Sequence, residues 1–90
     1  MKKTLEEYRQ EIDTVDEELL TVLAKRFDIV REIGKLKKEK KILPLDEKRW
    51  EEVIDKINNK ATKLNLSKNF IKNIYDEIHK AALMIERNNE

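Results

Sequence analysis

The sequence has no cysteine and contains only one glycine, one proline and one histidine in 90 residues. Without cysteine there is no disulfide framework, no thiolate metal ligand and no thiol nucleophile. A single histidine excludes a metal site built from several histidines. One glycine also excludes the glycine-rich loops that hold phosphate groups. At 90 residues, the chain is expected to form one small domain.

The sequence also lacks a long apolar run and an excess of charge of one sign. Twenty Lys and Arg stand against nineteen Asp and Glu, which gives a net charge of +1, whereas a general nucleic-acid binder usually carries a larger basic excess. No apolar stretch is long enough to span a membrane. Acidic residues occupy positions 6 and 7, where a signal peptide needs its apolar stretch. We expect a cytoplasmic protein that binds neither nucleic acid nor membrane.

Apolar residues recur at spacings of three and four, a pattern that predicts three helices and no strand. The first helix is expected over about residues 5–38, with Gly34 inside it at a cost of roughly 1 kcal/mol relative to alanine. Pro44 cannot continue a helix. Asp46 and Ser67 are suitable N-caps for the second and third helices. The charged majority of the remaining residues fits the solvated faces of such helices.

The first predicted helix is too long for one compact chain of this size. A helix over residues 5–38 is about 50 Å long, whereas a compact 90-residue globule is only about 30 Å across. Its stripe stays apolar over most of that length, so the overhanging part needs a cover. We therefore predict one all-α domain over residues 1–90, with one long and two shorter helices, in an intertwined homodimer. A monomer with a broken first helix is the alternative.

Several basic residues interrupt or flank the apolar stripes. Arg26 takes a core position in the first helix, and a buried guanidinium without an anionic partner costs several kcal/mol. Arg9 and Lys37 lie on one flank of the same stripe, and Arg49 borders the stripe of the second helix. The acids that could pair with them are Asp16, Asp46 and Glu86. This surplus of half-buried cations indicates either a ligand with two or more carboxylates or ion pairs within a coiled-coil interface.

One pattern joins all these segments of the chain and is specific because no short motif is involved. It consists of Arg9, Ile12, Asp13, Val15, Asp16, Leu19, Leu20, Leu23, Arg26, Ile33, Gly34, Lys37, Asp46 and Arg49. This pattern resembles the all-helical class of chorismate mutases over nearly the whole chain. The resemblance implies an intertwined dimer with two equivalent active sites. It also implies the conversion of chorismate to prephenate in aromatic amino-acid biosynthesis, with no cofactor and no metal.

The resemblance implies a role for each charged position. Arg9 would reach into the active site of the partner chain and bind a carboxylate of chorismate, a small dianion. Arg26 and Lys37 would bind carboxylates within their own chain, and Lys37 would also donate a hydrogen bond toward the ether oxygen whose bond breaks. Arg49 would line the pocket, and Glu86 would stand beside the ether oxygen.

Three further positions concern the substrate, and two of them depart from the family's pattern. The resemblance implies that Asp46 contacts the substrate hydroxyl through its backbone. Trp50 stands where an acid usually contacts the ring hydroxyl, and Ala82 stands where a small polar residue is often found near a carboxylate. Trp50 is also placed to pack on Leu45 as a hydrophobic staple. His79, alone of its kind, is expected to serve packing or the surface.

Two other functions remain open at this point. A related lyase that releases pyruvate from isochorismate shares the fold and the cations, and an apolar residue after Arg49, such as Trp50, is reminiscent of that branch. Asp46 and Glu86 favour the mutase. The non-enzymatic alternative is a helical dimerisation module, including one that regulates a partner enzyme of the shikimate pathway.

Overall fold

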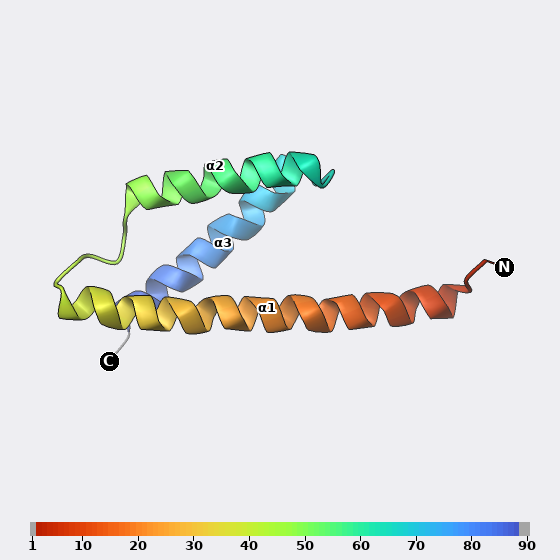
Figure 1. Ribbon diagram of the computed structural model, residues 1–90, viewed down its shortest axis with the longest axis horizontal. Helices are drawn as coiled ribbons and strands as arrows, with labels where there is room; N and C mark the ends of the chain where they lie inside the picture. Colours follow the sequence, from red (N-terminus) through yellow and green to blue (C-terminus); the bar gives the residue numbers. More distant parts are fainter. Residues whose placement is uncertain (1, 89–90) are drawn as a thin grey trace.

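The protein is described by a computed structural model that covers residues 2–88 and contains three α-helices joined by two short connections (Figure 1). The helices are α1 (Leu5–Glu39), α2 (Glu47–Lys63) and α3 (Lys68–Arg87), and no strand occurs within residues 2–88. The all-helical prediction is therefore confirmed. α1 runs without interruption through Gly34, so the alternative with a broken first helix is wrong. No helix in the described part of the chain is long and apolar enough to cross a membrane.

Side chains at the helix starts explain where each helix begins. The side-chain oxygens of Thr4, Asp46 and Ser67 each accept a hydrogen bond from the backbone N–H three residues further on, which satisfies a donor that the helix itself leaves unpaired. The chain leaves α1 and α2 through Lys41 and Asn65, both with a φ of 58°. This left-handed conformation commonly ends a helix. The predicted N-caps of the second and third helices are confirmed.

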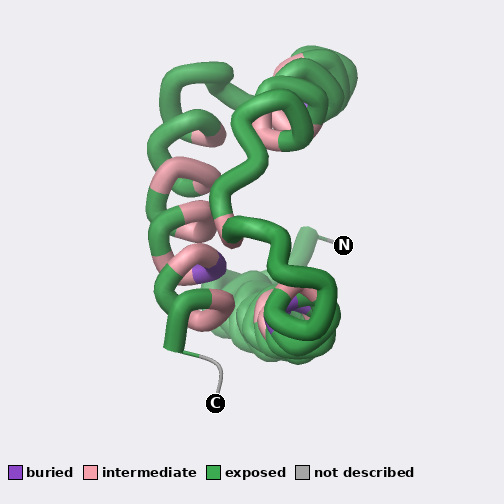
Figure 2. The backbone as a smooth tube through the Cα atoms, turned by 90° about the vertical axis from the view of Figure 1, so that its left-hand side faces the viewer, coloured by how far each residue is buried: buried purple, intermediate pink, exposed green. Residues whose placement is uncertain are grey.

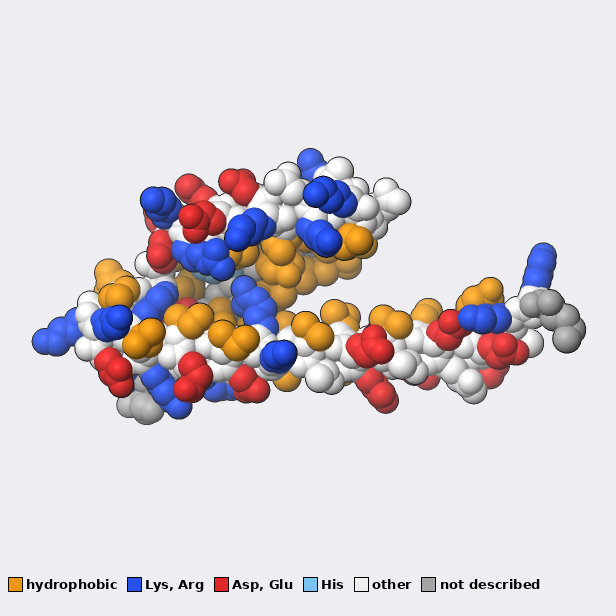
Figure 3. All heavy atoms as spheres, in the orientation of Figure 1, with side chains coloured by type: hydrophobic (Ala, Val, Ile, Leu, Met, Phe, Trp, Pro, Cys, Tyr) orange, Lys and Arg blue, Asp and Glu red, His pale blue; other side chains and the backbone are white. Residues whose placement is uncertain are grey.

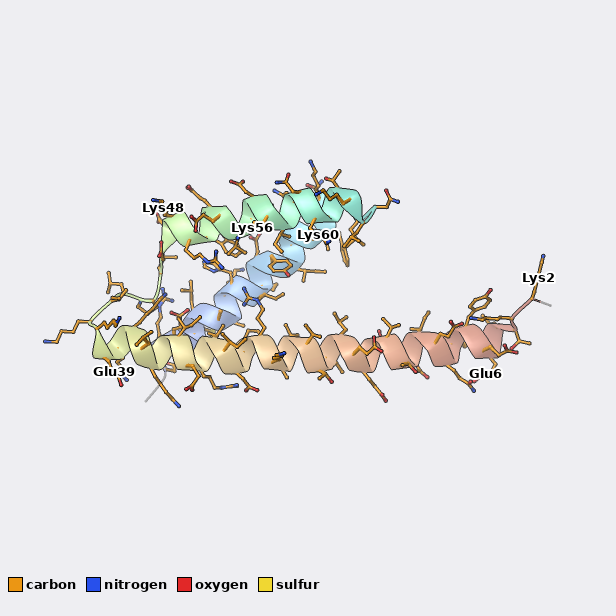
Figure 4. All side chains as sticks on the ribbon, in the orientation of Figure 1. Lys2, Glu6, Glu39, Lys48, Lys56 and Lys60 are labelled. Carbon is orange, nitrogen blue, oxygen red and sulfur yellow. The ribbon has the colours of Figure 1, made fainter. Side chains whose placement is uncertain are left out.

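α1 extends well beyond the other two helices. It contains 35 residues, and the chain measures 60 × 27 × 15 Å with a radius of gyration of 16.8 Å, against about 12 Å for a compact chain of this length. Glu6 and Glu39 mark the two ends of α1 in Figure 4, and α2 and α3 lie over the part toward Glu39. α3 packs on both α1 and α2, whereas the backbones of α1 and α2 do not come close to each other. The predicted overhang of the first helix is confirmed.

Very few side chains are buried in the single chain, as Figure 2 shows. Within residues 2–88 the buried positions are Val30 and Gly34 of α1, Ala61 of α2 and Ala82 of α3. All four residues are small, which allows neighbouring helices to approach closely. No large side chain in this part of the chain is fully enclosed. The three helices alone therefore form a thin layer rather than a filled core.

An apolar stripe runs along the free half of α1 and is exposed (Figure 3). Its members are all more than half exposed: Leu5, Tyr8, Ile12, Val15, Leu19 and Val22. Because they recur every three or four residues, they lie on one side of the helix. A contiguous apolar surface of this kind marks an interaction site rather than an ordinary solvent-facing surface.

The buried Gly34 tests the α1–α3 contact. It lies on the side of α1 that faces Glu86 and Arg87 near the end of α3. We expect Gly34→Leu to lower the free energy of unfolding by about 1 to 3 kcal/mol, because the new side chain would force the helices apart. Urea denaturation followed by circular dichroism measures the loss. The exposed Lys35→Leu is the control and should change stability by less than about 0.5 kcal/mol; equal effects would contradict the close contact.

Candidate active site

A half-open cavity of about 330 Å³ lies between the C-terminal half of α1, the start of α2 and the face of α3. Lys and Arg side chains gather around the hollow between α1 and α2 (Figure 3). The structure brings seven of the eight predicted site residues to the walls of this cavity: Arg26, Lys37, Asp46, Arg49, Trp50, Ala82 and Glu86. They come from all three helices and from the connection before α2. The remaining walls are mainly apolar.

Arg26 lies on α1 at the cavity wall and is half-buried. Its Nη1 atom is buried and has no hydrogen-bond partner within residues 2–88. A buried cationic nitrogen without a partner is unfavourable, because it has lost water and gained nothing in return. An anionic ligand in the cavity would supply the missing partner.

Lys37 is held in place on the cavity wall by two contacts. Its Nζ atom donates a hydrogen bond to the Pro44 carbonyl oxygen at 2.6 Å and lies 2.8 Å from Glu86 Oε1. The side chains of Lys37 and Glu86 are only 20% and 10% exposed. Glu86 Oε1 accepts no hydrogen bond within the described residues, so its contact with the ammonium is an ion pair of poor hydrogen-bond geometry. The ammonium is thus fixed in position, and the carboxylate oxygen keeps an acceptor site.

Asp46 and Arg49 form the rim of the cavity at the start of α2. The Asp46 carboxylate accepts a hydrogen bond from the Arg49 backbone N–H at 3.0 Å, so it is occupied as the helix cap. The Arg49 side chain is 60% exposed and its Nη1 lies 3.8 Å from Glu52 Oε1, a distance typical of a weak surface pair. The expectation of a half-buried Arg49 is wrong for the single chain, because the first turn of α2 lies at the open edge of the cavity.

Arg9 is the one predicted site residue that lies away from the cavity. It is exposed on the free half of α1 and is about 25 Å from Arg26 along the helix axis. Because α1 is a continuous helix, Arg9 cannot reach the cavity of its own chain. The expectation that Arg9 is half-buried is not met in the single chain.

Trp50 and His79 form an aromatic pair across the cavity wall. Their rings are stacked with centroids 3.8 Å apart and an interplanar angle of 13°, and both residues line the cavity. Sequence reasoning assigned His79 to packing or the surface and did not include it in the site. The spacing on α3 could have placed His79 in the site. His79, Ala82 and Glu86 recur at intervals of three and four, so they share one face of the helix.

The charge state of His79 depends on its surroundings in the cavity. Burial lowers the pKa of His79 below its ordinary value of 6.5, and the nearby cations Arg26 and Lys37 lower it further. The carboxylates of Asp76 and Glu86 act in the opposite direction. The net effect favours a neutral imidazole beside two fixed positive charges.

The arrangement is suited to holding a small anion. Arg26, Lys37 and Arg49 line one cavity, and Arg26 has a buried nitrogen without a partner in residues 2–88. Within residues 2–88, no group of three or more His, Cys, Asp or Glu side chains is arranged to hold a metal ion. The cavity therefore offers a small anion positive charge held in a fixed geometry.

The chain belongs to the chorismate mutase type II family, whose sequence profile matches residues 8–87. The match covers α1 from Tyr8, all of α2 and α3, and every predicted site residue, and it confirms the resemblance that the sequence pattern indicates. This membership supports the function of a chorismate mutase. No curated protein matches the chain individually.

The unpartnered charge predicts an unusual stability effect for Arg26→Met. Because methionine fills similar space without a buried charge, we expect the free energy of unfolding to stay equal or to rise. Urea denaturation measures this effect. Arg31→Met, which removes an exposed arginine paired with Asp28, is the control and should change stability little. A strong loss of stability in Arg26→Met alone would mean that Arg26 has a structural role.

The lowered pKa of His79 predicts a pH dependence of folding. An unfolded chain binds a proton at His79 near the ordinary value of 6.5, more tightly than the folded chain does. Stability contributed by the neutral form is therefore fully present above that pH and is lost as the pH falls below it. Melting temperatures between pH 8 and 5 should fall more steeply for the natural chain than for His79→Gln. Parallel curves would contradict the burial of a neutral imidazole.

Proposed function

We propose that this protein is a chorismate mutase that converts chorismate to prephenate in aromatic amino-acid biosynthesis. The observation that carries the proposal is the buried, unpartnered Nη1 of Arg26 at the cavity that also holds Lys37. Chorismate is a small dianion, and two carboxylates match a site with more than one fixed cation. Membership of the chorismate mutase type II family supports this substrate.

The chemistry of this rearrangement suits what the cavity contains. One carbon–carbon bond forms while one carbon–oxygen bond breaks within the same molecule, so neither a nucleophile nor a proton shuttle is needed. The task of the protein is to hold the dianion in a compact, chair-like geometry and to stabilise negative charge on the ether oxygen. Side chains on rigid helices perform both tasks with little reorganisation.

Arg26 and Lys37 are the groups that we assign to the substrate's charges. The Arg26 guanidinium would bind a carboxylate and satisfy its buried nitrogen. The Lys37 ammonium, held by the Pro44 carbonyl, would bind a carboxylate and donate a third hydrogen bond toward the ether oxygen. Glu86 stands beside Lys37 and would face the same oxygen. A protonated Glu86 could donate a hydrogen bond there, whereas an ionised one would repel the developing charge.

The rim residues would complete the enclosure of the substrate. Because the Asp46 carboxylate caps α2, its contact with a substrate hydroxyl would run through its backbone. Arg49 is exposed at the rim and would add positive potential at the entrance. Trp50 and Ala82 would shape the apolar wall, since neither offers an acidic or hydroxyl group to the ligand.

We also propose that the active form is an intertwined homodimer. A compact monomer of 10.8 kDa exposes roughly 5,500 Å², whereas this chain exposes 7848 Å². The excess is on the scale that obligate dimers bury. The apolar stripe on the free half of α1 would pack against the partner, and Arg9 would then reach the partner's cavity. Each active site would then contain basic side chains from both chains.

A second candidate is a lyase that releases pyruvate from isochorismate. The specific observation in its favour is Trp50, which places an indole on the cavity wall directly after Arg49. Both reactions require the same cations, so the cavity alone does not choose between the two substrates.

The test is to supply chorismate and isochorismate separately to the purified protein and to follow prephenate and salicylate. We expect prephenate from chorismate and no salicylate from isochorismate. Arg26→Ala and Lys37→Ala should abolish turnover. The exposed Lys80→Gln should retain it. Salicylate from isochorismate would establish the lyase, and no product from either substrate would leave a non-catalytic dimerisation module.

The shared-site dimer predicts complementation between two inactive variants. Arg9→Ala chains lack the residue given to the partner, and Arg26→Ala chains lack a residue of their own cavity. Mixing the two after mild unfolding should form heterodimers with one intact site in two, so turnover should return to about a quarter of the natural level in an equal mixture. Native mass spectrometry confirms that heterodimers form. Heterodimers without activity would contradict the exchange of Arg9 between chains.

A further inference from the structure

We propose that His79 is an additional substrate-binding residue that takes up a proton from solvent when the dianion enters the cavity, so that affinity for the dianion rises as the pH falls. This inference rests on the proposed function, since the dianion is chorismate. His79 lies on α3, stacks on the indole of Trp50, and lines the same cavity as Arg26 and Lys37 of α1.

The stacking geometry directs the polar edge of His79 away from Trp50. One face of the imidazole is covered by the indole at 3.8 Å, and the two ring nitrogens lie in the plane of the ring. No side-chain hydrogen bond joins either nitrogen to the part of the chain that the structure describes. Because His79 lines the cavity, a ligand there can use a ring nitrogen that has no partner within residues 2–88.

The charges around His79 decide when it carries a proton. Arg26 and Lys37 face it from α1, and both oppose a third positive charge. On α3, Asp76 and Glu86 favour the proton. From α2, Asp46 and Arg49 line the same cavity with opposite charges. Without a bound anion, burial and the nearby cations prevail, so the pKa of His79 lies below its ordinary value.

A bound dianion changes the electrostatic balance around His79. Two carboxylates placed against Arg26 and Lys37 neutralise the cations that opposed the proton and add negative charge beside His79. The imidazole then binds its proton more tightly in the complex than in the empty cavity. By thermodynamic linkage, affinity for the dianion rises as the pH falls through the range in which the complex holds that proton and the free protein does not. The uptake involves one proton, which moves from solvent to a ring nitrogen.

Two substitutions distinguish proton uptake by His79 from its stacking on Trp50. His79→Phe keeps a flat ring against Trp50 but has no nitrogen and no charge to gain. His79→Gln keeps a hydrogen-bonding group but neither stacks nor titrates in this range. A purely structural role for His79 would move the melting temperature and leave the pH dependence of binding unchanged.

The experiment measures KM and kcat for chorismate between pH 8 and 5.5, together with calorimetric binding in two buffers of different ionisation enthalpy. For the natural chain, we expect KM to fall roughly fivefold toward pH 5.5, the scale of one added charge near a bound anion. Binding near pH 6.5 should take up a fraction of a proton that approaches one. His79→Phe and His79→Gln should show a flat KM and no proton uptake.

Two further variants decide between explanations. Lys80→Gln removes an exposed charge that pairs with Glu77 outside the cavity, so it should keep the natural profile. Glu86→Gln should also keep the slope of KM. If the slope disappears in Glu86→Gln and persists in both His79 variants, Glu86 is the titrating group and the inference is overturned.

Failure of the proposed function gives a different result. In that case the natural chain forms no prephenate at any pH. Calorimetric binding of chorismate still measures whether binding takes up a proton, so the inference is tested without turnover. Binding without proton uptake, or no binding at all, would overturn the inference as well. Turnover with a KM that does not depend on His79 would overturn the inference and leave the proposed function intact.

Discussion

A single uninterrupted helix sets the geometry of this molecule. α1 holds Arg26 and Lys37 on the same helix that carries the exposed apolar stripe, so the positions of these two cations and of the stripe cannot vary independently. A bend at Gly34, which lies between the two cations, would move Lys37 relative to Arg26 and the stripe. The glycine remains helical, and its missing side chain serves the close approach of a neighbour rather than flexibility.

The cavity exists because the backbones of α1 and α2 stand apart. α3 packs on both and keeps them apart, and the space between them is closed on one side by the stacked rings of Trp50 and His79. The small residue Ala82 lies buried beside this space, where a larger side chain would occupy it. The same helix that holds the fold together therefore also preserves the volume available to a ligand.

The sequence predicted the helices well because their causes are local. Periodicity gives the buried side of a helix, and Pro44, Asp46 and Ser67 mark the breaks through backbone chemistry that acts within a few residues. The register of the predicted site residues on and beside those helices brought seven of them to one cavity. Periodicity cannot predict how far a neighbouring helix extends. For that reason the exposure of Arg49 at the rim was not foreseen, and the partnership of His79 with Trp50, which depends on two helices meeting, was missed.

The stacked pair has a practical consequence, since Trp50 is the only tryptophan in the chain. Its fluorescence comes from one known place, and its nearest ring neighbour is an imidazole 3.8 Å away. A protonated imidazole withdraws electron density from an excited indole far more effectively than a neutral one does. The emission of this protein is therefore an intrinsic optical signal of the charge inside its cavity, and it can be read in real time without a label or a coupled assay.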